Sequence, residues 1–167
     1  KEVIIFQPEN FEDRRGYLIE SYRENFYKEY LPSVNFVQDN ESMSSFGVIR
    51  GLHYQLPPYE QSKLVRVVKG EIQDVAVDLR RDSTTYLKYV SVVLNDKNRK
   101  QLYIPKGFAH GFLVLSPEAI VNYKMDGYFN LETYKGIRYD DPKLAIKWEL
   151  DNKKIKLSEN DSNDNFI

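Results

Sequence analysis

The sequence of 167 residues contains no cysteine. Disulfide bonds, zinc–thiolate centres and thiol nucleophiles are therefore excluded. The absence of cysteine suits a reducing compartment, so we expect a cytoplasmic protein. Histidine is nearly as scarce, because only His53 and His110 occur.

Long apolar runs and a surplus of positive charge are also missing. No segment approaches the roughly 20 apolar residues that a membrane-spanning helix needs, and Lys1 to Gln7 becomes polar too soon for a signal peptide. Lys and Arg number 24 against 25 Asp and Glu, which gives a formal net charge of -1. We therefore expect no membrane and no nucleic acid among the partners.

Aromatic residues are plentiful, with 13 Tyr and 9 Phe, and these residue types favour β-strands. Val75, Val77 and Leu79 recur at a spacing of two, which is the strand period. Short apolar runs bounded by turn residues predict six strands, over Lys63 to Val68, Ile72 to Leu79, Tyr89 to Leu94, Gln101 to Ile104, Gly111 to Leu115 and Ala119 to Lys124.

Helix signals are few. One short helix is predicted over Glu24 to Tyr30, where Phe26 and Tyr30 share a face and Pro32 follows. Many short strands at close spacing predict an all-β protein, built as a jelly-roll β-sandwich or barrel. No repeat or linker divides the chain, so we expect a single domain over residues 1–167, with residues 151–167 as a polar tail on the barrel surface.

Each histidine lies within two residues of a glycine in a short motif. Pro105-Lys106-Gly107-Phe108-Ala109-His110 has the form Pro-x-Gly-x-x-His, the second half of the pattern found in cupins, a jelly-roll superfamily. Metal-binding cupins carry His-x-His and a glutamate in the first half. Here Gln55 stands where the second histidine of that pair would be, two residues after His53, while Glu60 keeps the spacing of the carboxylate. His53, Glu60 and His110 are thus one candidate site for iron or another metal. Alternatively, the histidines are hydrogen-bonded at strand ends and Glu60 is a solvated charge.

An ordered set of motifs extends along nearly the whole chain. They are Phe11-Glu12-Asp13-Arg14-Arg15-Gly16-Tyr17, Phe36-Val37-Gln38-Asp39-Asn40, Arg50-Gly51-Leu52-His53, Lys63-Leu64-Val65-Arg66, Asp74-Val75-Ala76-Val77-Asp78-Leu79-Arg80, Pro105 to Phe112, Asn122-Tyr123-Lys124 and Asp140-Asp141-Pro142. Together they resemble the dTDP-4-dehydrorhamnose 3,5-epimerase family, whose members are metal-free cupins.

The resemblance implies an isomerase of dTDP-rhamnose and cell-surface polysaccharide synthesis. It would invert C3, C5 or both in a nucleotide-linked 4-keto-6-deoxysugar, with dTDP-4-dehydro-6-deoxy-D-glucose as the expected substrate and dTDP-4-dehydro-L-rhamnose as the expected product. The C4 ketone acidifies the neighbouring C–H bonds, so a base can form an enolate and an acid can return a proton to the opposite face. Such chemistry implies no metal and no cofactor.

Four residues occupy the positions of the family's catalytic groups. His53 is the expected base, because an imidazole exchanges protons near neutral pH. Lys63 is expected to stabilise the enolate oxygen, and Tyr123 to donate the proton on the opposite face. Asp161, in Leu157-Ser158-Glu159-Asn160-Asp161, is expected to orient His53. A strand lysine, a strand tyrosine and a solvated tail aspartate are the structural alternatives.

For substrate binding the resemblance implies Arg15, Tyr17, Glu20, Gln38, Asn40, Arg50, Asp74 and His110. The two arginines would grip the diphosphate bidentately. Phe129 departs from the family, which often has tyrosine there, and phenylalanine cannot donate a hydrogen bond.

The family resemblance also implies a homodimer in which strands of one subunit extend the partner's sheet. The apolar segment Val3 to Phe6, within residues 1–10, is the expected exchanged strand. Two other functions stay open on the sequence alone: a metal-dependent cupin enzyme and a sugar-binding cupin without catalytic activity.

Overall fold

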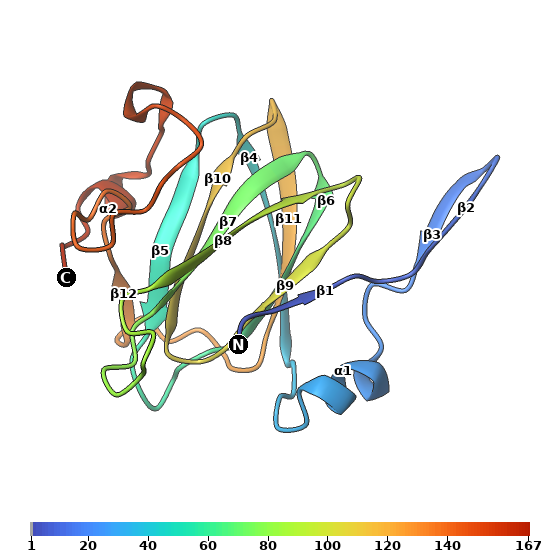
Figure 1. Ribbon diagram of the computed structural model, residues 1–167, viewed down its shortest axis with the longest axis horizontal. Helices are drawn as coiled ribbons and strands as arrows, with labels where there is room; N and C mark the ends of the chain where they lie inside the picture. The colour runs from blue at the N-terminus through green and yellow to red at the C-terminus, as the bar shows by residue number, and fades with distance from the viewer. Residues whose placement is uncertain (1) are drawn as a thin grey trace.

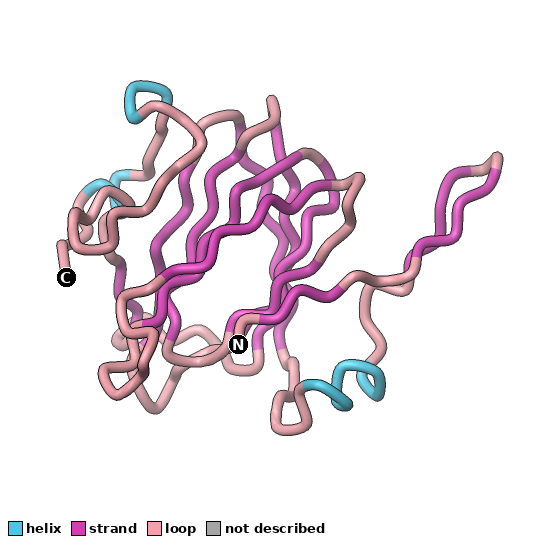
Figure 2. The backbone as a smooth tube through the Cα atoms, viewed as in Figure 1, coloured by secondary structure: helices cyan, strands magenta, loops and turns pink. Residues whose placement is uncertain are grey.

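The computed structural model describes residues 2–167. Two five-stranded antiparallel sheets pack face to face, and a two-stranded hairpin stands apart from them (Figures 1 and 2). The strand order is β1-β9-β6-β11-β4 in the first sheet and β12-β5-β10-β7-β8 in the second. This architecture confirms the predicted all-β jelly-roll class.

The elements have the following bounds. The first sheet comprises β1 (Ile4–Phe6), β4 (Gln38–Ser45), β6 (Lys63–Lys69), β9 (Gln101–Ile104) and β11 (Glu118–Met125). The second comprises β5 (Ile49–Gln55), β7 (Glu71–Asp78), β8 (Tyr89–Asn95), β10 (Phe108–Val114) and β12 (Tyr134–Gly136). The other elements are β2 (Asn10–Asp13), β3 (Gly16–Ile19), α1 (Glu24–Tyr30), the 3-10 helix η1 (Asn152–Lys154) and α2 (Glu159–Ser162).

The period-two pattern locates most of the central strands. All six predicted strands are present, and the predicted helix has the bounds of α1. β10 begins at Phe108, three residues before the prediction, because the preceding turn ends at Gly107, whose φ is +80. β4 was not predicted, since its Gln38–Ser45 sequence is almost wholly polar. The polar tail of residues 151–167 contains two short helices, η1 and α2.

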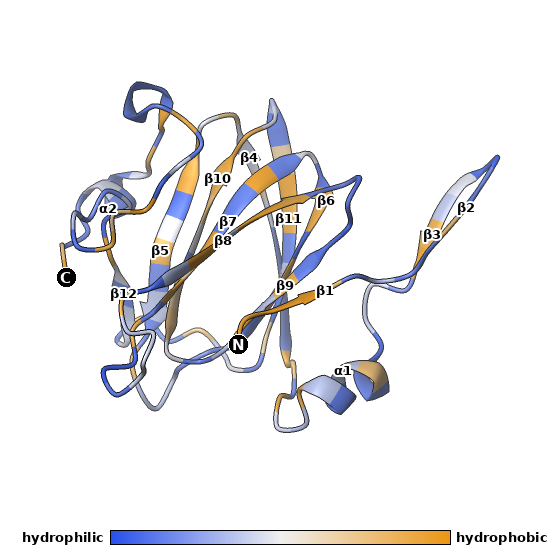
Figure 3. Cartoon of the chain, in the orientation of Figure 1, coloured by the Kyte–Doolittle hydropathy of each residue, from blue (hydrophilic) through white to orange (hydrophobic). Residues whose placement is uncertain are grey.

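Side chains from the inner faces of both sheets form the main core. β7 shows the alternation: Ile72 and Ala76 join this core, whereas Val75 and Val77 pack on the outer face against Leu144 and its neighbours. Figure 3 shows the resulting mixture of apolar and polar residues along the strands. Burying each Val, Leu or Ile side chain contributes about 1.5–3 kcal/mol, so the sandwich is the rigid part of the molecule.

Two peripheral features lie beside the sandwich. Tyr27 of α1 and Leu31, which follows the helix directly, pack in one apolar cluster with Phe6 of β1 and Tyr103 of β9. The β2–β3 hairpin projects away from both sheets (Figure 1). β1 pairs with β9 of the same chain, so the exchange of this strand between subunits stays a prediction. Within residues 2–167, no helix has the length and apolar character needed to cross a bilayer.

Candidate active site

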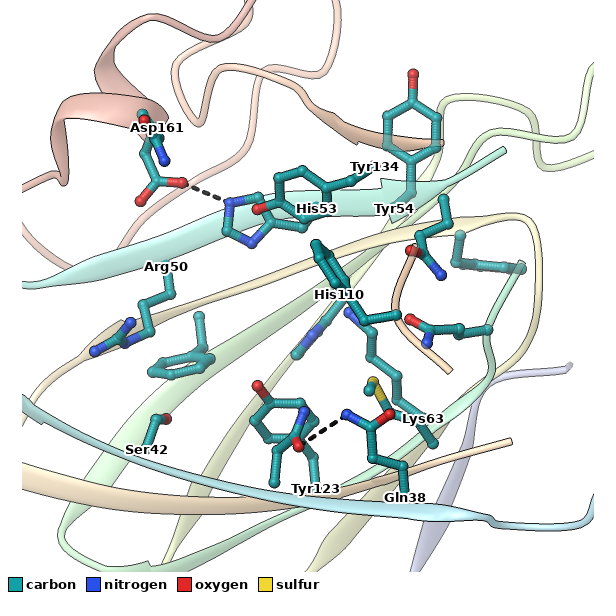
Figure 4. Close-up of a pocket in the computed structure, with 18 of the residues that line it drawn as sticks. Gln38, Ser42, Arg50, His53, Tyr54, Lys63, His110, Tyr123, Tyr134 and Asp161 are labelled. Atoms are coloured by element: carbon teal, nitrogen blue, oxygen red, sulfur yellow. Dashed lines mark hydrogen bonds and ion pairs between the residues drawn. The ribbon is translucent and has the colours of Figure 1, made fainter. Parts of the chain in front are cut away.

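A cavity of about 730 Å³ opens between the two sheets, and residues of both sheets and of the tail line it (Figure 4). Eight of the predicted site residues line this cavity: Gln38, Asn40, Arg50, His53, Lys63, His110, Tyr123 and Asp161. The motifs that carry them are far apart in the sequence, so the fold is what gathers them.

Strand alternation explains why one wall is polar. Gln38, Asn40 and Ser42 occur at every second position of β4, and all three line the cavity. Lys63 of β6 and Tyr123 of β11 belong to the same sheet. Their strands continue into the apolar core at Val65 and Val121, which share the inward-facing parity. The active-site wall is therefore an extension of the core in which polar residues replace apolar ones.

The opposite wall holds both histidines. His53 of β5 and His110 of β10 are directly paired across the antiparallel ladder. Between them the strands approach closely at Gly51, where φ is +112 and an added Cβ would lie 2.5 Å from the His110 carbonyl oxygen. Only glycine fits this position, and the close approach keeps the two imidazoles on one surface.

His53 makes its main polar contact with the tail. Its Nε2 lies 2.5 Å from Oδ1 of Asp161, and Figure 4 shows the other ring nitrogen turned toward the cavity. Ser158 caps α2, because its Oγ accepts the N–H of Asp161 at 3.1 Å and donates to Oδ2 of that residue at 2.7 Å. The cap therefore fixes the carboxylate, and the carboxylate in turn fixes the imidazole.

The charge state of Asp161 follows from these contacts. Burial alone would raise the pKa of the carboxyl group, but hydrogen bonds with His53 and Ser158 hold its pKa below the usual value. Asp161 is thus an anion able to stabilise a protonated His53.

His110 has a carboxylate of its own. Its Nε2 lies 3.0 Å from both oxygens of Asp74, which is fully buried on β7. Burial lowers the pKa of His110, although Asp74 opposes this shift. Asp74 does not line the cavity, so it supports His110 from behind, whereas the family resemblance placed it among the substrate-binding residues.

Lys63 lines the cavity from β6 of the first sheet. Burial lowers its pKa to about 8, and the charge of Asp74 partly offsets that effect. The side chain is thus still predominantly ammonium at neutral pH, in a site where water screens its charge poorly.

Tyrosines face His53 from two sides. Tyr123 projects from the first sheet, across the cavity from His53 (Figure 4). Tyr134 of β12 packs on the imidazole with ring centroids 5.1 Å apart. Burial, with the nearby charge of Asp161, raises the pKa of Tyr134. Phe129 contacts Tyr134 edge to face at 5.4 Å, so the residue that departs from the family still lines the cavity.

The predicted anion-binding residues divide into two groups. Arg50 lies in the cavity, where its Nε donates to Ser44 Oγ at 2.8 Å. Arg15 lies outside it, on the tip of the β2–β3 hairpin, paired with Asp13 and with 90% of its side chain exposed.

Tyr17 and Glu20 also lie outside the cavity of their own chain. Tyr17 stacks under Arg99 at 3.8 Å from its ring centroid, and Glu20 pairs with Arg23 at 3.3 Å. The sequence grouped Arg15, Tyr17 and Glu20 with the cavity residues. In the fold of a single chain, however, these three side chains lie outside that cavity.

The alternative metal site is not assembled. Within residues 2–167, the histidine and carboxylate side chains that converge are His53, Asp161 and Asp164. Glu60 lies instead near Gly107, and His110 is bonded to Asp74. The three residues proposed for that site, His53, Glu60 and His110, are therefore not gathered around one point.

Several cavity residues were missed at the sequence level. Ser42 would have followed from the alternation of Gln38 and Asn40 had β4 been recognised as a strand. Tyr134 lies outside every motif, and so does Asp164, which is near His53 but does not line the cavity; no local pattern marks either residue. The other unpredicted lining residues are Tyr54, Gln55, Gln61, Phe108, Phe112, Met125, Leu131, Ser158 and Asn160.

Comparison with known proteins gives a consistent result. A family model described as dTDP-4-dehydrorhamnose 3,5-epimerase matches residues 1–167. The chain is 52% identical over 149 residues to a protein of that name from Methanothermobacter thermautotrophicus, covering 89% of this chain and 80% of the relative. It is 49% identical over 152 residues to the Shigella flexneri protein, covering 90% and 84%.

Solved structures show the same similarity. An epimerase from Legionella pneumophila, in complex with dTDP-4-keto-L-rhamnose, superposes with a TM-score of 0.95 at 45% identity, covering 99% of this chain and 87% of that one. ChmJ, a 3'-monoepimerase from Streptomyces bikiniensis in complex with dTDP-quinovose, superposes with a TM-score of 0.91 at 27% identity, covering 99% and 84%.

Proposed function

The chain belongs to the family of dTDP-4-dehydrorhamnose 3,5-epimerases, and on that premise we propose that it inverts both C3 and C5 of dTDP-4-dehydro-6-deoxy-D-glucose, giving dTDP-4-dehydro-L-rhamnose. The chain is an epimerase. Its greater identity to 3,5-epimerases, 52% and 45%, than to the monoepimerase, 27%, supports inversion at two centres.

One relationship carries the mechanism: His53 and Tyr123 face each other from opposite sheets across the cavity. His53 removes the proton from the carbon beside the C4 ketone, and the bonding pair moves into an enolate with its negative charge on O4. The Lys63 ammonium stabilises that oxygen. Tyr123 then donates its hydroxyl proton to the other face of the same carbon, which inverts the centre. Solvent restores both protonation states.

The remaining cavity residues bind the nucleotide diphosphate in this proposal. Arg50 pairs with phosphate oxygens, and Gln38 and Asn40 hold the base and the linkage. His110, kept neutral by burial and oriented by Asp74, contacts the sugar.

The hairpin residues support a homodimer. Arg15 and Tyr17 lie on a hairpin that projects from the sandwich, and Glu20 follows directly after it. We propose that the hairpin reaches the cavity of a second copy, because these side chains cannot meet the substrate in their own subunit. The cytoplasmic location expected from the sequence stays a prediction.

Deuterium exchange tests the reaction. Incubation with the substrate in heavy water should place deuterium at C3 and C5, as read by NMR at each ring position, and His53→Ala should abolish uptake. Deuterium uptake at only one of the two carbons would indicate a monoepimerase. No uptake with enzyme and substrate in equal amounts would favour a sugar-binding protein without catalytic activity.

Subunit complementation tests the dimer. His53→Ala and Arg15→Ala are each expected to be inactive as pure proteins. Mixing them by reversible unfolding should restore activity, because one cavity of the mixed dimer then has an intact His53 and a partner's intact hairpin. Activity that stays absent in proven mixed dimers would contradict the arrangement.

A further inference from the structure

Two carboxylates lie beside His53, and the mechanism above uses only one. One polar atom each from His53, Asp161 and Asp164 lie within 4.8 Å of one another. Both carboxylate oxygens of Asp161 have partners, because Oδ1 contacts His53 and Oδ2 accepts a hydrogen bond from Ser158. Oδ2 of Asp164 is buried, yet it has no hydrogen-bond partner within residues 2–167.

The backbone makes a specific place for the second carboxylate. Gly136 of β12 is paired directly with His53 of β5. A Cβ added to Gly136 would overlap the Asp164 carboxyl group. The carboxylate therefore occupies the volume that a side chain at position 136 would fill.

The chain around Asp164 is anchored on both sides. Asn165 forms a parallel bridge with Ile137, next to Gly136, and its carbonyl oxygen accepts the Arg138 N–H at 3.1 Å. On the other side, Ser158 caps α2. The carboxylate is thus placed by the backbone and not by a polar partner of its own.

A carboxylate oxygen that is buried without a partner, as Oδ2 of the partly buried Asp164 is, destabilises the folded state. Burial raises the pKa of Asp164, the positive charge available at His53 opposes that shift, and the negative charge of Asp161 adds to it. The energetic penalty is therefore reduced when His53 is protonated, which is the state that follows proton abstraction.

We propose that Asp164 is a positioning residue that stabilises the imidazolium form of His53 after it has taken the substrate proton. This inference rests on the proposed role of His53 as the base. Asp164 does not line the cavity, so it acts through His53 and not on the substrate.

The charges around His53 explain the need for a second anion. Titratable groups face His53 from the elements packed around it. They are Asp161 of α2, Asp164 after α2, Tyr134 of β12, His110 of β10 with Asp74 of β7 behind it, Lys63 of β6 and Tyr123 of β11. Lys63 must stay cationic to hold the enolate, and its charge disfavours a second cation nearby. Asp161 and Asp164 together offset that repulsion on the side away from the substrate.

Two variants remove this carboxylate from His53 in different ways. Asp164→Asn removes the charge with little change of shape. Gly136→Ala keeps the charge but displaces it, and Gly136 has no positive φ that would strain alanine. Glu159→Gln is the matched control, because it removes one negative charge from an exposed position on α2.

We expect Asp164→Asn to lower kcat about tenfold with KM nearly unchanged. The acidic limb of its pH–kcat profile should move to lower pH, because the protonated base is less stabilised. Its Tm should rise by about 2 °C, since an unpaired, partly buried charge is gone. Gly136→Ala should lower kcat similarly, the double variant should lose no more than either single one, and Glu159→Gln should match the parent.

Three results would overturn the proposal: an unchanged kcat and acidic limb in Asp164→Asn, a kcat loss accompanied by a fall in Tm, or additive losses in the double variant. His53→Ala belongs in the same series. If His53→Ala stays active, the proposed function itself fails. If it is inactive while Asp164→Asn behaves like the parent, only the role of Asp164 fails.

Discussion

His53 Nε2 and Asp161 Oδ1 lie 2.5 Å apart although 108 residues separate them in the chain. One residue belongs to a central strand and the other to a four-residue helix in the tail. Their contact joins the tail to the base, so changes in the tail should affect catalysis.

Asp161→Asn should lower kcat by about a hundredfold or more, because an amide neither stabilises the imidazolium nor selects the same tautomer. KM should change little. Steady-state kinetics by NMR or a coupled assay measures both values. Glu60→Ala is the control and should retain parental activity; a similar loss there would revive a role for the loop carboxylate.

Ser158→Ala should affect both stability and rate. It removes the cap of α2, which costs about 1 kcal/mol, and it leaves Asp161 Oδ2 without its donor. We expect a lower Tm and a kcat between those of the parent and Asp161→Asn. Asp151→Ala removes the cap of η1, away from His53, and should lower stability alone. Equal kcat losses in both variants would show that tail stability, and not Asp161, sets the rate.

The basic limb of the pH–kcat profile should reflect the loss of the proton from the Lys63 ammonium group. Because burial lowers the pKa of Lys63 to about 8, the ammonium is present below that pH and is lost as pH rises through it. kcat should therefore fall above pH 8, when O4 loses its stabilising charge. Lys63→Arg should be slower at pH 7 but should keep its rate to higher pH. The control is Lys69→Arg, at the exposed end of the same strand; a basic limb unmoved in Lys63→Arg would contradict the assignment.

Tyr123→Phe should separate proton removal from inversion. His53 can still form the enolate, but no phenol returns a proton on the opposite face. Deuterium should continue to enter from heavy water while inversion slows about a hundredfold. NMR detects both events in one sample, and nucleotide binding should survive. Tyr128→Phe, at a 70% exposed position, is the control. Loss of nucleotide binding in Tyr123→Phe would indicate a structural role instead.

Gly51→Ala should destabilise the fold strongly. The added Cβ would meet the His110 carbonyl oxygen at 2.5 Å, and φ is +112. Gly16 also has a positive φ, +125, but has nothing within 4 Å of an added Cβ. We therefore expect Gly16→Ala to cost about 1–2 kcal/mol from backbone strain and Gly51→Ala to cost clearly more. Chemical denaturation gives both values, and equal losses would mean that the strands separate easily at Gly51.

The sequence predicted most of the scaffold because alternation is local. Val75 and Val77 identify β7 without any knowledge of its neighbours. β4 was missed because its inward-facing residues line a cavity and are polar. Its alternation of inward and outward residues therefore does not appear as an alternation of apolar and polar residues. The ordered motifs likewise identified the residues of both cavity walls, such as His53 and Tyr123.

The chain by itself therefore determined the six strands β6 to β11, the family and the main cavity residues, all of which leave local or ordered patterns. Only the tertiary structure decided that Arg15 points away from its own cavity and that Asp74 supports His110. It alone also brought Asp164 beside His53 over Gly136. These relationships depend on which strands pair and on where the C-terminal tail packs against the sandwich. A contact between residues far apart in the chain produces no periodic pattern in the sequence of either segment, so the sequence does not reveal it.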